Sequence, residues 1–170
     1  MTMRGGRRGR FGLMLSMIAG WSAGCGYTTE RPFPTDIQTI CVEMFHSKEF
    51  RRELEIELTE ALVKRIEMDT PYRVAPCDRA DSAISGEIIE VQQRTIGTDF
   101  DTDLPRETGA TIVMSWRWKD LRTGELLRER GRFLYTTTYI PPVGESFPTG
   151  MTRGLDGMAE RIVEAMEKSW

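Results

Sequence analysis

Few residues of this chain are arranged for catalysis. The 170 residues include a single histidine, His46, which excludes zinc sites and catalytic motifs that need two histidines. The sequence has no Gly-Lys-Ser/Thr phosphate loop, no Gly-x-Ser-x-Gly elbow and no Cys-x-x-Cys pair. We therefore expect no enzyme, no catalytic residue and no cofactor, and we interpret His46 as a surface or capping residue.

Three aspartates at alternating positions, Asp99, Asp101 and Asp103, imitate the start of a calcium-binding loop. Such a loop has glycine at its sixth position and glutamate at its twelfth. The corresponding residues are Leu104 and Ala110. We therefore expect a solvated hairpin tip without a metal, with calcium binding as the alternative.

The unusual charge feature is a set of basic residues at alternating positions of two neighbouring predicted strands. Five cations on one face of a sheet repel one another unless acids or an anionic ligand lie between them. One interpretation is a solvated face balanced by Glu87 and Glu90 on the next strand. The other is a docking surface for lipid phosphates or an acidic partner, which guanidinium groups bind well. The five candidate binding residues are Arg117, Lys119, Arg128, Arg130 and Arg132.

Two cysteines, Cys41 and Cys77, belong to the part of the chain that we expect to be exported. Disulfides persist in oxidising compartments outside the cytoplasm. Cys41 lies within one predicted strand and Cys77 follows another, so a parallel crossover would bring the thiols together. A disulfide and two separate buried thiols are both compatible with the sequence, because a bridge demands a specific geometry.

The start of the chain has the pattern of a cleavable export signal. Residues 1–10 are basic, and 11–23 form an apolar run shorter than the roughly 20 residues of a spanning helix. Small residues then precede Cys25, which resembles the bacterial lipobox, where cleavage occurs before a cysteine that receives acyl chains such as palmitate. We predict a lipoprotein signal peptide at 1–24 and lipid attachment at Cys25. A plain secretory signal with an incidental cysteine is the alternative.

The predicted mature chain is mildly acidic. Four of the 23 basic residues and none of the 26 acidic residues precede Cys25, which leaves 19 bases against 26 acids and a net charge of −7. General nucleic-acid binding needs a basic surface, so we exclude it. The second mature residue, Gly26, is not the aspartate that retains lipoproteins in the inner membrane. The resemblance to lipoproteins therefore implies an outer-membrane destination.

The remaining chain predicts a single domain, 37–170, behind a lipidated tether, 25–36. Apolar residues alternate over 37–45, which indicates a strand. They then recur at steps of three and four from Lys48, which predicts an amphipathic helix that ends before Pro71.

A short strand can form at 72–74 and is left out of the element order below, and a longer one is expected at 82–96, with a bulge at Gly86. An irregular loop at 140–153 then precedes a closing helix from about Leu155 to Lys168.

The clearest element is a hairpin, 108–119 and 125–139, around a loop whose Gly124 suits a left-handed conformation. Its alternation predicts one apolar face and one face that carries the five cations, which is typical of an antiparallel sheet covered on one side. We predict an α/β (α+β) fold of order β-α-β-β-β-α, with two helices on one face of a four-stranded mixed, mainly antiparallel sheet. The expected apolar face holds Ile112, Met114, Trp116 and Trp118 on one strand and Leu127, Gly131, Phe133 and Tyr135 on the other.

Six segments and the closing helix, taken in order, carry a family resemblance. Their order is a stronger signal than any one of them, because none is catalytic. The segments are Cys25–Tyr27, Thr39–Phe45, Phe50–Leu62, Ala80–Glu87, Trp118–Glu125 and Tyr139–Gly144. Along nearly its whole length, the chain resembles the LPS-assembly lipoprotein family, LptE.

This resemblance implies a two-helix, four-stranded sandwich at the periplasmic side of the outer membrane. It also implies that the protein plugs and helps to assemble a β-barrel partner, LptD, and contacts lipopolysaccharide. The family's lipid-contacting basic residues have no residue-by-residue match here, so the five cations are the candidates. A structural lipoprotein subunit of another envelope export or assembly complex is the alternative. A periplasmic hydrolase would need convergent acids with perturbed pKa values, for which the sequence offers no support.

Overall fold

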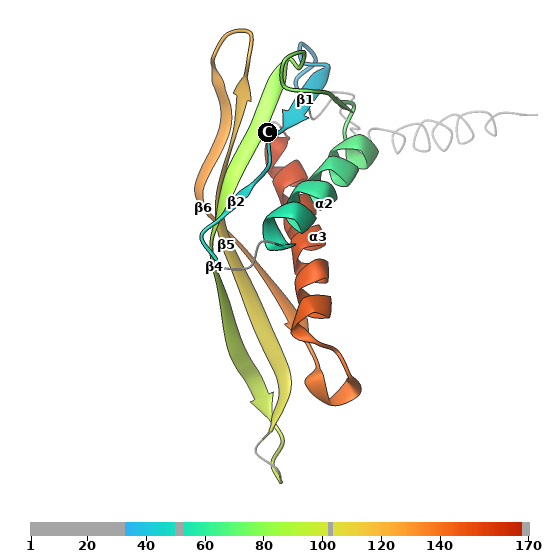
Figure 1. Ribbon diagram of the computed structural model, residues 1–170, viewed down its shortest axis with the longest axis vertical. Coiled ribbons are helices and arrows are strands. Elements are labelled where there is room, and N and C mark those ends of the chain that lie inside the picture. The colour runs from blue at the N-terminus through green and yellow to red at the C-terminus, as the bar shows by residue number, and fades with distance from the viewer. Residues whose placement is uncertain (1–32, 50–52, 102–103, 168–170) are drawn as a thin grey trace, which may run out of the picture. The chain divides into compact units, whose positions relative to one another are not determined.

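Two helices cover one face of a mixed β-sheet in this protein (Figure 1). The computed structural model describes residues 33–49, 53–101 and 104–167. The predicted signal peptide and Cys25 lie outside the described residues. The elements are β1 (Thr39–Val42), β2 (His46–Ser47), α2 (Glu53–Asp69), β3 (Arg73–Val74), β4 (Ser82–Thr98), β5 (Pro105–Asp120), β6 (Leu126–Tyr139), the 3-10 turn η2 (Pro141–Val143) and α3 (Phe147–Met166).

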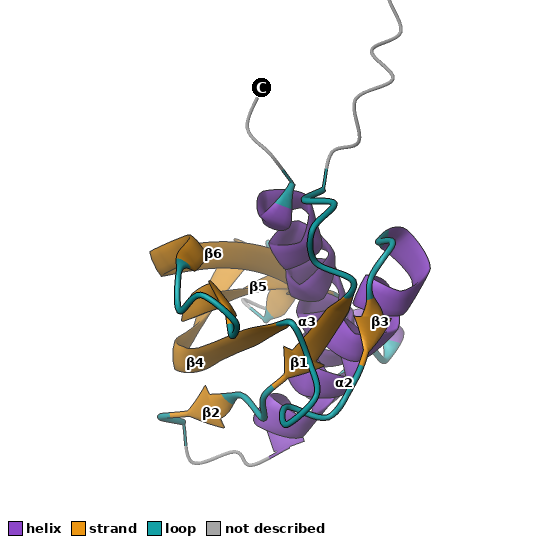
Figure 2. Cartoon of the chain, turned by 90° about the horizontal axis from the view of Figure 1, so that it is seen from above, coloured by secondary structure: helices purple, strands orange, loops and turns teal. Residues whose placement is uncertain are grey.

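The sheet has the strand order β3-β1-β4-β5-β6, and β2 pairs separately with β4. Strand β1 runs parallel to β3 and to β4, whereas β4, β5 and β6 form an antiparallel meander. The view from above shows α2 and α3 on the same side of these strands (Figure 2). The predicted two-helix α+β fold is therefore confirmed. The described residues form six strands rather than four, because the short strand at 72–74 does form, as β3, and because β2, of two residues, is too short for alternation to distinguish.

Helix α2 connects the parallel pair β1 and β3 and packs on the sheet through one stripe. Its buried residues, Leu54, Leu58, Leu62 and Ile66, follow the steps of three and four that the sequence predicts for this helix. The predicted start at Lys48 is wrong, because the Lys48 amide donates to the Ile88 carbonyl oxygen at 3.0 Å and so continues the pairing of β2.

The predicted bulge at Gly86 is also wrong. Gly86 pairs in regular register with Trp116, and the register shifts further along, between Ile88 and Glu90. The bulge therefore leaves Ile89 as the extra residue of β4.

The hairpin of β5 and β6 forms as predicted. Gly124 has a φ of +79° and donates its amide to the Asp120 carbonyl oxygen at 2.9 Å. The predicted apolar residues of β5 are almost completely buried under the helices, where they form the centre of the core. They are Ile112, Met114, Trp116 and Trp118.

Helix α3 begins at Phe147, eight residues before the predicted start. Ser146 caps it by accepting a hydrogen bond from the Thr149 amide, and Pro148 is tolerated because the first helical turn needs no amide donor there. Gly154 allows the helix to lie close to β6, since a Cβ there would stand 2.8 Å from Thr137 Cγ2. None of the helices in the described ranges is long and apolar enough to cross a bilayer.

The segment before β1 is packed into the core. Phe33, within the predicted tether, contacts the Tyr72 ring edge-on at 5.7 Å, and Tyr72 in turn contacts Trp118 at 5.7 Å between centroids. The Tyr72 hydroxyl donates to the Pro34 carbonyl oxygen at 3.1 Å, and burial raises the pKa of this phenol. The folded part therefore includes Phe33.

Candidate functional site

The structure does not bring the five cations onto one face of the sheet. Residues paired directly across two antiparallel strands share a face. Arg117 pairs with Glu129, whereas Trp116 pairs with Arg130 and Trp118 pairs with Arg128. Arg128 and Arg130 therefore project toward the helix side, and the prediction of one cationic face is wrong.

An extra residue in β6 causes this change of face. Met114 pairs with Phe133, but Trp116, two residues further along β5, pairs with Arg130, three residues back along β6. A one-residue insertion moves every later side chain to the opposite face. Phe133 is therefore on the predicted helix side, while Gly131 and Arg132 occupy the irregular stretch.

Two of the cations donate hydrogen bonds to backbone carbonyl oxygens. Arg128 donates to the oxygens of Leu127 at 2.9 Å and of Glu167, at the end of α3, at 3.2 Å. Arg130 donates to the Glu129 oxygen at 3.3 Å. Because β6 is the last strand of the described sheet, these contacts blunt an edge that would otherwise offer free carbonyls to another strand.

The expected acidic balance of the cations does not form. Glu87 pairs instead with Lys48 at 2.8 Å, and Glu90 accepts a hydrogen bond from Gln92 at 2.9 Å. None of the five cations forms an ion pair with a carboxylate in the described ranges. Their positive charge is therefore available to an external anion.

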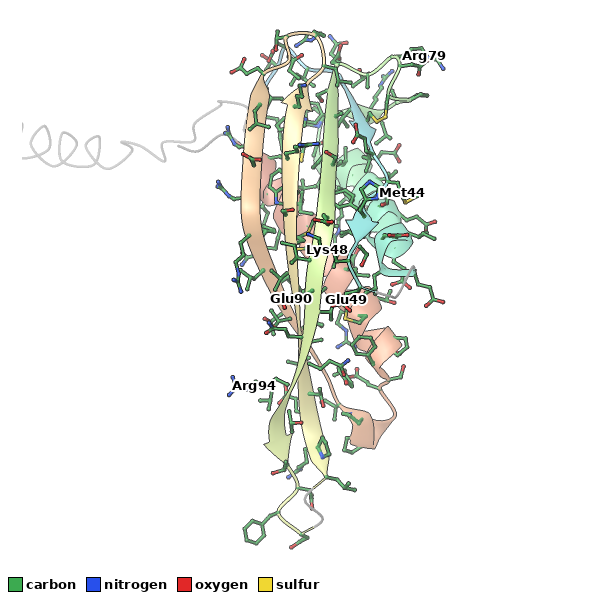
Figure 3. All side chains as sticks on the ribbon, turned by 60° about the vertical axis from the view of Figure 1, so that its left-hand side comes forward. Met44, Lys48, Glu49, Arg79, Glu90 and Arg94 are labelled. Carbon is green, nitrogen blue, oxygen red and sulfur yellow. A yellow bond between two sulfur atoms is a disulfide. The ribbon has the colours of Figure 1, made fainter. Side chains whose placement is uncertain are left out.

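The face of the sheet opposite the helices, here called the open face, carries polar side chains at most of its register positions, among them Glu90, which is labelled in Figure 3. Arg117 donates to the Ser85 hydroxyl at 3.3 Å, and the hydroxyls of Thr111 and Thr136 lie 3.0 Å apart. The open face therefore offers hydrogen-bonding groups, interrupted by the apolar residues Val113, Leu134 and Leu126. Its register positions include Ser85, Glu87, Gln92, Thr111, Ser115, Arg117, Lys119, Glu129 and Thr136.

A hollow of about 350 Å³ lies on the open face, here called the open-face hollow. Small residues and charged residues of both signs line it. Of the predicted cations, Arg117 and Arg130 are among the lining residues, Arg130 from a register position on the helix side, whereas Lys119, Arg128 and Arg132 are not. The small lining residues are Ser85, Gly86, Ser115 and Gly131, and the lining also includes Glu43, His46, Glu87 and Glu129.

Acidic residues predominate in the helix layer. Helix α2 contains six acidic residues and two basic ones, and acids also follow the outer face of α3 at Asp156, Glu160 and Glu164. An anionic ligand is therefore disfavoured at the acidic outer surface of the helices.

A polar cluster that sequence reasoning missed fastens the turn between β5 and β6 to the N-terminal segment. Arg122 contacts Asp120 at 2.8 Å and Asp36 at 3.3 Å. The Arg122 hydrogen bond lowers the pKa of Asp120 to about 2, although burial opposes this shift. The Asp81 carboxylate accepts from the amides of Gln38 and Thr39, and these bonds lower its pKa. Alternating charge in a turn is the one signal that points to such a cluster.

Cys41 and Cys77 are joined by a disulfide, with their Cα atoms 4.9 Å apart. The parallel pairing of β1 with β3 brings the two residues together, since Cys77 lies three residues after β3.

Two of the three aspartates of the β4–β5 tip, Asp99 and Asp101, belong to the described part of the chain. The Asp101 amide donates to the Asp99 carboxylate at 3.1 Å, while Asp103 lies outside the described residues. Throughout 33–49, 53–101 and 104–167, no three histidine, cysteine or acidic side chains are grouped to hold a metal ion.

The comparisons with known proteins agree with this architecture. The model of the LptE family, described as lipopolysaccharide-assembly, matches residues 37–166. None of the curated proteins matches the sequence.

Two solved structures are similar in fold alone. PelC from Paraburkholderia phytofirmans, solved as a dodecamer, has a TM-score of 0.52 and 12% identity over 82% of this chain and 96% of that chain. The hypothetical protein CT253 from Chlamydia trachomatis has a TM-score of 0.50 and 11% identity over 76% of this chain and 98% of that chain.

Proposed function

Because the chain belongs to the LptE family of lipopolysaccharide-assembly proteins, we propose that it is an outer-membrane lipoprotein subunit of the lipopolysaccharide translocon. In this role it plugs the lumen of an LptD-like β-barrel, helps the barrel to assemble and contacts lipopolysaccharide during delivery. The role requires binding rather than catalysis, and we assign no catalytic residue.

The proposed anchor is a set of acyl chains on Cys25, after removal of residues 1–24. Each buried methylene contributes about 0.8 kcal/mol, so two or three chains hold a protein at a membrane almost permanently. The residues between Cys25 and Phe33 then connect the anchor to the folded domain on the periplasmic side.

The polar open face supports the barrel partner. The lumen of an outer-membrane barrel is lined by polar residues. Strands β4 and β5, of 17 and 16 residues, each extend roughly 50 Å at about 3.3 Å per residue, which exceeds the roughly 25 Å apolar band of such a barrel. The open face is therefore long and polar enough to contact the lumen wall of such a barrel.

The unpaired cations support contact with lipopolysaccharide, and they are the observation that carries the proposal. Phosphate groups bind guanidinium through paired, charge-assisted hydrogen bonds. Lys119 and Arg132 are exposed and form no ion pair with a described carboxylate, so a phosphate would meet no internal competitor there.

Copurification of the tagged, lipidated protein from native membranes tests this function. We expect wild type to retain a β-barrel protein and lipopolysaccharide, and the double variant Lys119→Glu, Arg132→Glu to lose lipopolysaccharide. The matched control is Lys64→Glu, Arg161→Glu, which makes the same charge change on the helix layer. If both variants retain lipopolysaccharide equally, the cations do not contact lipopolysaccharide. If wild type retains no β-barrel protein, the proposal that the protein plugs a barrel is rejected.

A further inference from the structure

Exposed apolar side chains gather at one end of the sheet, here called the apolar end. Phe100 is fully exposed, and Ile96, Leu104 and Val143 are each more than half exposed. The turn η2 belongs to the same end, because β6 finishes opposite the start of β5 and η2 packs beside β5. The apolar end consists of Ile96, Phe100, Leu104, Ile140 and Val143.

The other exposed large apolar residues of the described chain are distributed over α2, β6 and two loops. Single exposed apolar residues are ordinary on a protein surface, whereas a group of them at one place marks a contact surface. The apolar end therefore has a partner to cover it.

The shape of the apolar end favours a fluid partner. Strands β4 and β5 extend beyond the helices, so the tip that joins them projects from the domain (Figure 1). The Asp99 amide donates to the Leu104 carbonyl oxygen at 2.8 Å across this tip. Backbone groups that are already paired enter an apolar phase at little cost. A bilayer surface deforms around such a projection and buries its side chains without a matching groove.

The charges beside the apolar end select the kind of bilayer. Arg94 and Arg106 form no ion pair with a carboxylate in the described ranges, and Asp101 and Glu107 form none with a base there. An anionic surface attracts the arginines but repels the acids. A zwitterionic headgroup carries a phosphate for the arginines and an ammonium group for the acids.

We propose that the apolar end inserts into a zwitterionic bilayer surface. Phe100 and Leu104 reach the boundary of the acyl chains, while the four charged residues beside them stay among the headgroups. This contact concerns the domain outside a barrel, because a domain enclosed in a barrel lumen has no access to lipid. It therefore goes beyond the proposed function, and it shares with that function only the proposed anchor.

The anchor and the apolar end together fix how the domain lies on the membrane. Strand β4 starts beside β1 and ends at the tip, roughly 50 Å away at about 3.3 Å per residue (Figure 1). The chain from Cys25 enters the fold at the β1 end. An anchor at that end and an inserted tip at the other require β4 to run along the membrane surface. A domain that stands upright on its anchor keeps Phe100 far from the lipid.

Quenching of tryptophan fluorescence by brominated lipid tests this contact. The mature lipidated protein is reconstituted into phosphatidylcholine vesicles with Phe100→Trp, and the emission of wild type is subtracted. Trp116 and Trp118 are buried in the core, so lipid reaches them poorly. The matched control is Ile56→Trp, at an exposed apolar residue of α2. Flotation of each protein with the vesicles reports the anchor separately.

We expect brominated phosphatidylcholine to quench the tryptophan at position 100 and not the one at position 56. Leu104→Ser, added to Phe100→Trp, should lower the ratio of inserted to free tips by about tenfold, because one leucine side chain no longer leaves water. Replacing part of the lipid with anionic phosphatidylglycerol should weaken the quenching. The changes Asp101→Asn and Glu107→Gln should restore it on the anionic vesicles, since only the arginines then remain.

Flotation without quenching at position 100 would overturn the tip contact and leave the anchor in place. Equal quenching at positions 100 and 56, or stronger quenching on anionic vesicles without the acid substitutions, would also overturn it. A blue shift of the position 100 emission in native membranes but not in vesicles would assign the apolar end to a protein partner instead. If the tip contact fails while a barrel still copurifies, the proposed function stands.

Discussion

Gly86 lies against the ring of Phe45 so closely that no larger residue fits between that ring and β5. A Cβ on Gly86 would stand 2.5 Å from Phe45 Cε1 and 2.5 Å from the Ser115 carbonyl oxygen. Phe45 is fully buried and Ser115 belongs to the centre of β5, so neither can withdraw cheaply. The glycine is therefore required by close approach rather than by its backbone conformation.

We predict that Gly86→Ala lowers the free energy of unfolding by about 1–3 kcal/mol through overpacking. Gly131→Ala is the control, because its new methyl group meets nothing and only reduces the freedom of the unfolded chain. Urea denaturation followed by tryptophan fluorescence measures both. A Gly86→Ala protein as stable as the control would contradict this packing.

Acid should destabilise the fold through Asp120. The pKa of this carboxyl is about 2 in the folded protein and about 3.9 when unfolded, so its contribution is present above the unfolded value and is lost as pH falls toward the folded one. We expect the urea midpoint to fall between about pH 4 and pH 2. The Asp120→Asn variant should have a lower urea midpoint at neutral pH. Its midpoint should fall less steeply with acid than that of wild type, and the fall that remains is due to Asp81. Parallel curves for wild type and Asp120→Asn would exclude this role.

Removal of the Cys41–Cys77 disulfide should lower stability. The bridge closes a loop with a sequence separation of 36, for which the chain-entropy relation gives about 4 kcal/mol. Cys77 is exposed, so mild reductant should act on the folded protein. We expect reduced wild type and Cys77→Ser to share a lower urea midpoint. A midpoint unchanged by either treatment would show that the bridge contributes nothing.

The lipid anchor predicts a defined amino terminus. Intact-mass measurement of the native polypeptide should show residues 1–24 removed and fatty acyl chains on Cys25. Cys25→Ser should prevent the modification and leave the protein unprocessed or soluble. A native chain with residues 1–24 intact, or an unmodified new terminus, would reject the anchor.

Features set by local periodicity could be predicted from the sequence. Leu54, Leu58, Leu62 and Ile66 are one helical stripe, and their burial follows from spacing alone. Gly124 likewise marks its turn, because its left-handed φ favours glycine. The burial or conformation of these residues is determined by neighbours close to them in the sequence.

Features set by contacts between distant segments could not be predicted. The extra residue in β6 places Arg128 and Arg130 on the helix side, and no local pattern distinguishes that bulge from continued alternation. The bulge predicted at Gly86 is wrong for the same reason, since glycine is required there by Phe45, which lies on another segment. The open-face hollow also depends on residues of four strands, β2, β4, β5 and β6, so the sequence could nominate Arg117, Arg130 and Glu87 but not their grouping with Glu43 and Glu129.

Photo-crosslinking in living cells tests the central claim most directly. A photoreactive residue at Lys119, on the open face, is compared with one at Glu60, which is exposed on the acidic α2. We predict covalent products with an outer-membrane β-barrel and with lipopolysaccharide from position 119, and no lipopolysaccharide product from position 60. No product of either kind from position 119, or an equally strong lipopolysaccharide product from position 60, would contradict the proposed role.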